Sequence, residues 1–64
     1  MTVYVNDTSV RIFSGATARD AVLRYCADTG TPFTDSLLYD SFGNVIAEDS
    51  PMNEGRRIYT SPSL

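Results

Sequence analysis

Two short runs at the start of the chain alternate apolar with polar residues. Residues 2–5 and 9–13 are rich in β-branched side chains, and their period of two is typical of strands with one buried face. Asn6-Asp7-Thr8 lies between them and favours a turn. The pattern therefore predicts a β-hairpin.

After the second run, the apolar period changes to that of an amphipathic helix. Thr17 followed by Asp20 is similar to a capping box and marks the start, and Gly30 marks the end. Arg24 stands four residues after Asp20, a spacing at which an acid and a base form an ion pair. We predict one helix over residues 18–28, with an apolar stripe made of Ala18, Ala21, Val22, Tyr25 and Cys26.

The second half of the chain is more polar and its apolar runs are shorter. Residues 37–39 and 45–47 flank a turn that contains Gly43, and residues 56–60 form the last predicted strand. Phe33, in the connector after the helix, is expected to pack at one end of the core. Met52, in an otherwise polar segment, is expected to reach the core from a loop.

The predicted order is two strands, a helix, two strands and a final strand, within a single domain spanning residues 1–64 and ending in a tail over 61–64. If the last strand lies parallel beside the first, one sheet face can bury the helix stripe. We expect that face to comprise Val3, Val5, Val10, Ile12, Leu38, Val45 and Ile58. The sequence thus predicts an α+β fold of the β-grasp kind, a mixed four- to five-stranded sheet with one helix packed on one face.

Composition narrows the possible functions. The net charge is −3, all five basic residues are arginines, and the chain has no histidine and no lysine. Without a basic face, binding to nucleic acid is not expected. Histidine- and lysine-based catalysis cannot be built from this chain, so we expect no enzyme activity, no metal and no cofactor. No apolar run is long enough to span a bilayer, and we expect no membrane association and a cytoplasmic location.

Two sets of residues are candidates for function. Cys26 lies on the helix stripe, where a free cysteine is usually a small buried apolar side chain, and the alternative is a modified thiol that carries sulfur. Tyr4, Phe13 and Tyr39 are expected to point away from the buried valines and leucines, with Tyr59 joining them and Arg57 available for an acidic partner. Such a face predicts binding to a partner protein, or to a second copy as a homodimer, against the alternative of scattered surface aromatics.

Two segments resemble a known family. Gly15-Ala16-Thr17 leading into the helix is similar to the entry common in the small sulfur-carrier proteins of thiamine and molybdopterin biosynthesis. The segment from Asp49 to Tyr59 is similar to the polar, apolar, turn and strand sequence of the same proteins. The resemblance covers most of the chain and implies a ubiquitin-like β-grasp fold, in which the helix-free sheet face is the usual recognition surface.

Sulfur carriers act through a flexible C-terminal diglycine, which an activating enzyme adenylates. The tail here reads Ser61-Pro62-Ser63-Leu64, in which the proline fixes φ and the leucine is bulky. The leading hypothesis is therefore a non-enzymatic protein-interaction module. The alternative is a sulfur carrier that uses a thiocarboxylate or a Cys26 persulfide, and a domain that binds a small ligand ranks last.

Overall fold

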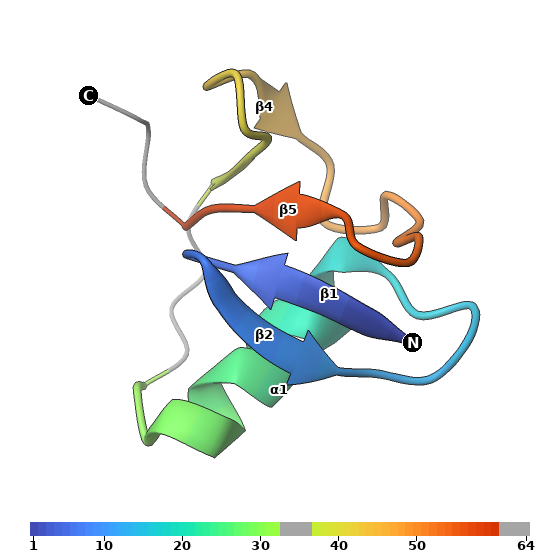
Figure 1. Ribbon diagram of the computed structural model, residues 1–64. Coiled ribbons are helices and arrows are strands. Elements are labelled where there is room, and N and C mark those ends of the chain that lie inside the picture. Colours follow the sequence, from blue (N-terminus) through green and yellow to red (C-terminus); the bar gives the residue numbers. More distant parts are fainter. Residues whose placement is uncertain (33–36, 61–64) are drawn as a thin grey trace.

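The structure is a computed structural model and describes residues 1–32 and 37–60. The chain begins with a hairpin of β1 (Thr2–Val5) and β2 (Thr8–Arg11) (Figure 1). Asn6 and Asp7 form the turn with φ values of 51° and 65°, the left-handed conformation that suits a two-residue hairpin. The predicted hairpin is confirmed. The second strand begins and ends earlier than the predicted 9–13, because a two-residue turn places Thr8 directly opposite Val5.

The predicted helix is α1 (Ala18–Thr29), and both of its predicted caps are present. The backbone N–H of Thr17 donates to the Asp20 carboxylate over 3.0 Å, and the Thr17 hydroxyl accepts from the Asp20 backbone N–H. Gly30 ends the helix with φ 71°. In place of the predicted Asp20–Arg24 pair, Asp20 serves the cap and Arg24 pairs with Asp28 at 3.1 Å.

The last strand, β5 (Arg57–Ile58), lies parallel to β1, as predicted, and completes a mixed three-stranded sheet of order β2-β1-β5. A second sheet pairs β3 (Leu38–Tyr39) with β4 (Val45–Ile46) in antiparallel fashion. Two reciprocal backbone hydrogen bonds of 2.9 and 2.8 Å join Tyr39 to Tyr59. The strands of the second half are thus shorter than predicted, but β3 lies directly beside the extension of β5.

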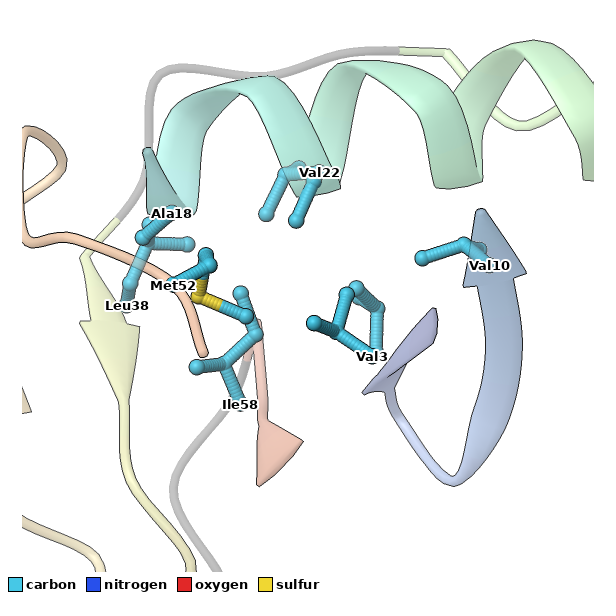
Figure 2. Packing of buried hydrophobic residues seen from close by; sticks show 9 residues of the cluster. Val3, Val10, Ala18, Val22, Leu38, Met52 and Ile58 are labelled. Carbon is cyan, nitrogen blue, oxygen red and sulfur yellow. The ribbon is translucent and has the colours of Figure 1, made fainter. Parts of the chain in front are cut away.

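Helix α1 crosses one face of β1 and β2 (Figure 1), and the apolar core lies between the helix and the strands (Figure 2). Met52 is 4% exposed, which confirms its predicted core position. The segment before β5 also covers the start of the helix, because the Ser50 and Glu48 carbonyls accept hydrogen bonds from the first helical N–H groups. The core cluster comprises Val3, Val5, Val10, Ala18, Ala21, Val22, Leu38, Met52 and Ile58, with Ile12, Tyr25 and Cys26 packed partly against it.

One predicted core residue is wrong. Val45 is 58% exposed, and its neighbour Ile46 packs against the core instead. The register pairs Leu38 with Ile46 on the core side, so Tyr39 and Val45, the next pair along, point the other way. A contiguous apolar run over 45–47 carries no period from which its buried side could be inferred.

Over the described residues the architecture is therefore α+β, with one helix, a mixed three-stranded sheet and a two-stranded sheet. Phe33 and the 61–64 tail lie outside the described residues. In residues 1–32 and 37–60, no helix has the length and apolar character needed to cross a membrane.

Candidate interaction face

The sheet surface opposite the helix gathers four of the residues predicted to bind a partner. Val5 and Ile58 are neighbours in the core, so the preceding pair, Tyr4 and Arg57, lie side by side on the opposite surface. Tyr59 follows Ile58 and returns to that surface, and its bridge partner Tyr39 lies beside it. We name this surface the tyrosine–arginine face and define it as Tyr4, Tyr39, Arg57 and Tyr59.

Arg57 lies at the centre of the contacts on this face. Its guanidinium carbon is 4.4 Å from the centre of the Tyr4 ring, a cation–π distance, and its Nη1 is 3.1 Å from the Asp7 Oδ1 atom. Exposed contacts of these two kinds stabilise a protein by about 0–1 kcal/mol each. Their main effect here is to hold the long arginine side chain against the sheet with its charge paired.

Asp7 connects Arg57 to Tyr59. The Tyr59 hydroxyl donates to the same Asp7 Oδ1 atom over 2.9 Å. Because the carboxylate accepts a hydrogen bond from the protonated phenol, the pKa of Tyr59 is raised above its ordinary value of 10.0. From the sequence, Asp7 was expected only to be a turn residue. Asp7 reaches the face through the left-handed conformation of the turn and the parallel pairing of β1 with β5. That pairing joins the two ends of the sequence, so no local pattern around Asp7 indicates it.

The other turn residue, Asn6, holds the far end of β5. Its side-chain amide donates to the Thr60 hydroxyl over 3.0 Å and accepts from the Thr60 backbone N–H over 3.1 Å. Its own backbone N–H donates to the Ile58 carbonyl over 3.0 Å. The hairpin turn therefore fixes the segment that carries Arg57 and Tyr59.

Phe13 does not belong to this face, which corrects the sequence-based expectation. The strand that was expected to reach residue 13 ends at Arg11, so the alternation cannot be extended to Phe13. Phe13 is 64% exposed and lines a surface hollow together with Leu23 of α1. It therefore lies near the helix rather than among the tyrosines.

Cys26 is half-buried and packs against the core cluster. It also lines a small hollow of about 110 Å³ with Tyr25, Pro32 and Thr60. Cys26 was expected to be buried in the core, and the structure places it at the edge of the core and only half-buried. Sulfur carriage on this thiol stays a prediction.

The tyrosine–arginine face combines aromatic rings with polar and charged groups. It presents phenol rings with polar tips and one guanidinium. The adjoining Asp7 carboxylate forms an ion pair with that guanidinium and accepts a hydrogen bond from the Tyr59 hydroxyl. Tyrosine and arginine are enriched at protein interfaces, where they supply apolar area together with hydrogen bonds. Comparisons with protein-family models, with curated proteins and with solved structures found no match for this chain.

Proposed function

We propose that this chain is a non-enzymatic, ubiquitin-like β-grasp module that binds a partner protein through the tyrosine–arginine face. The arrangement of the strands supports the fold assignment. The order β2-β1-β5 is extended beyond β5 by β3 and then β4. Helix α1 covers the sheet face opposite the tyrosine–arginine face. A β-grasp fold would have this order of strands, so the order supports the proposal.

One observation carries the functional proposal: Arg57 is held between the Tyr4 ring and the Asp7 carboxylate, beside Tyr59 and Tyr39. Burying an unpaired charge in an interface is costly, whereas this guanidinium already has its counter-ion. The tyrosine side chains have few rotatable bonds and lose little entropy when a partner covers them. Covering the face therefore costs less desolvation free energy than covering an unpaired arginine would, and less entropy than covering flexible side chains would.

Site-specific photo-crosslinking in the native host would test the proposal. A benzophenone amino acid replaces Tyr39, and in a matched variant it replaces Ala27, an exposed residue of α1 on the other side of the molecule. We expect a discrete protein adduct from position 39 and none of the same mass from position 27. An adduct of twice the chain mass would identify the partner as a second copy.

Equal labelling from the two positions, or no adduct from position 39, would count against the face. A third variant, with the probe at Arg57, checks that the result belongs to the face rather than to one side chain. All three probe positions are exposed or half-buried, so the fold tolerates them better than a change in the core.

The sulfur-carrier alternative makes a different prediction. With an activating enzyme and ATP, sulfide would displace AMP from the adenylated C-terminus and leave a thiocarboxylate. A persulfide donor would instead transfer its outer sulfur to the Cys26 thiolate and leave as a thiol, and intact mass would detect either product. An unchanged mass across several activating enzymes would leave the interaction module as the sole proposal. The C-terminal residues that would react lie outside the described residues.

A further inference from the structure

The outer edge of β2 offers backbone groups to an additional strand. Met1 and Ile12 exchange two backbone hydrogen bonds of 2.7 and 2.9 Å between them. Because antiparallel pairs alternate, Val10 also directs its N–H and C=O toward β1, and Ser9 and Arg11 direct theirs outward. Among residues 1–32 and 37–60, β2 has a strand neighbour on one side only. Its outer edge is therefore a template for β-strand addition.

A hollow of about 560 Å³ lies next to this edge, between the end of β2 and α1. Three apolar side chains line it: Leu23 is 40% exposed, Phe13 is 64% exposed and Ile12 is half-buried. Its polar lining consists of Arg11, of Asp20, whose carboxylate serves the helix cap, and of Arg24, which pairs with Asp28. A strand added to β2 would point every second side chain toward the helix side of the sheet, where this hollow lies. Those positions of the added strand should be apolar.

Arg11 lies at the rim of the same hollow. Within the part of the chain that the structure describes, it has no hydrogen-bond or ion-pair partner, and it is exposed. The other four arginines all have partners, namely Arg19 with Glu48, Arg24 with Asp28, Arg56 with Ser50 and Arg57 with Asp7. An unpaired cation at the edge of a chain of net charge −3 favours an acidic side chain in the ligand.

We propose that the β2 edge and the adjoining hollow bind an extended peptide segment of a partner protein, in which apolar and acidic residues alternate. The residue opposite Arg11 in the added strand points to the same side as Arg11, and an acidic side chain there can pair with it. The residues on either side of it point into the hollow against Leu23 and Phe13. This surface is separate from the tyrosine–arginine face, so the two proposals stand or fall independently.

A second copy of the chain fits this edge less well. If two β2 strands paired antiparallel about Val10, each Arg11 would face Ser9 of the other copy. That pairing supplies no carboxylate for Arg11 and brings together two chains of the same net charge. An extended peptide with alternating apolar and acidic residues can form backbone hydrogen bonds with the β2 edge and an ion pair with Arg11.

The test uses the ¹⁵N-labelled full chain and three blocked pentapeptides, Val-Asp-Val-Asp-Val, Val-Lys-Val-Lys-Val and Ser-Asp-Ser-Asp-Ser. We expect the first peptide to shift the backbone amide signals of Ser9 and Arg11 downfield and to move the Leu23 signals, with a dissociation constant in the high micromolar to millimolar range. The lysine and serine peptides should bind more weakly. Because the whole chain is acidic, a preference for the acidic peptide must come from a local charge.

Two matched variants assign that local charge. Arg11→Gln should raise the dissociation constant for the valine–aspartate peptide about two- to five-fold, the range for one exposed ion pair. Arg19→Gln removes the same charge at the start of α1 and should leave the constant unchanged. Leu23→Ser should weaken binding of every valine-containing peptide, since it removes the apolar wall of the hollow.

Three results would overturn the proposal. The first is equal affinity for the aspartate and lysine peptides. The second is the absence of shifts at Ser9 and Arg11, in which case Arg11 serves only to keep the edge from pairing. The third is a concentration-dependent shift of those two signals without peptide, which would make a second copy the occupant.

Discussion

Two valines, Val10 and Val45, were both expected in the core from the sequence, and they provide the sharpest test of the strand registers. Val10 is 2% exposed and Val45 is 58% exposed, although both lie in short antiparallel strands. Val10→Ala and Val45→Ala remove the same two methyl groups and lower β-propensity by the same residue change. The difference between their unfolding free energies therefore reports burial.

The structure sets the expected sizes. Removing a fully buried valine side chain down to alanine loses about 1.6 kcal/mol of transfer free energy, at about 0.8 kcal/mol for each buried carbon. The cavity left under α1 adds to this, so Val10→Ala should cost about 2 kcal/mol. At Val45 less than half of the side chain is buried and no cavity forms, so the cost should be about 0.7 kcal/mol or less.

Urea unfolding followed by far-ultraviolet circular dichroism measures both variants, since the chain has no tryptophan to serve as a fluorescent probe. A domain of this size has roughly 3–5 kcal/mol of net stability, so the Val10 variant should lose about half of it while the Val45 variant stays folded. In thermal unfolding, each kcal/mol corresponds to about 4–8 °C in Tm. An unchanged m-value in both variants confirms that the free energies are comparable.

Equal losses for the two variants would refute the β3–β4 register. Val45 would then face the core, Ile46 would face outward, and Tyr39, which shares a side with Val45, would leave the tyrosine–arginine face. The stability measurement is therefore also a test of the surface on which the proposed function rests.

Three further predictions concern the turn, the helix start and the face. Asp7→Asn should lower the pKa of Tyr59 toward 10.0, and an ultraviolet titration of the tyrosines would show this as ionisation at a lower pH. In the wild type the pKa of Tyr59 is raised by folding, so its hydrogen bond to Asp7 stabilises the fold below pH 10. That stabilisation is lost as the pH rises through the folded-state pKa of Tyr59. Asn6→Gly keeps the left-handed turn but removes both side-chain hydrogen bonds to Thr60, and should lower the free energy of unfolding in urea by about 1–2 kcal/mol. An unchanged free energy of unfolding would show that these two hydrogen bonds do not hold the strand. Thr17→Ala should cost about 1 kcal/mol by removing the helix cap, and Thr17→Ser, which keeps the hydroxyl, should restore most of it.

Local signals predicted the first half of the fold well. The hairpin and its turn residues, the helix and both of its caps depend on residues close together in sequence, and the pattern reports them directly. The parallel position of the last strand was also predictable, because the helix stripe needs an apolar surface and Ile58 supplies part of it. Met52 was identified for a similar reason, as a large apolar residue in a polar segment.

The two errors have one common cause: the strands concerned are too short for the sequence to indicate which side a residue takes. β4 is two residues long, so Val45 and Ile46 could be assigned to either side with equal support. Phe13 was placed by extending the period of β2 beyond Arg11, where the strand has ended. The side of Val45 is set by the pairing of β4 with β3, and Phe13 lies where the chain has already left β2.

The role of Asp7 required information that no local pattern contains. The residue lies in the first turn and its partners Arg57 and Tyr59 lie in the last strand, so their contact exists only once β5 is parallel to β1. Asn6 makes the same connection to Thr60. The two turn residues therefore hold the C-terminal strand and shape the tyrosine–arginine face at the same time.

This double use of the turn has a consequence for binding. The carboxylate that pairs with Arg57 belongs to a backbone fixed on both sides, by the β1–β2 hairpin and by the Asn6 bonds to Thr60. The guanidinium is thus held over Tyr4 before any partner arrives, and a partner need not order it. Loosening the turn while leaving the face residues intact should therefore weaken binding through the entropy of Arg57. Asn6→Gly tests this effect of the turn by itself, because it alters no side chain of the tyrosine–arginine face. If a fully folded Asn6→Gly protein cross-links from position 39 as efficiently as the wild type, preorganisation of Arg57 by the turn contributes nothing to binding.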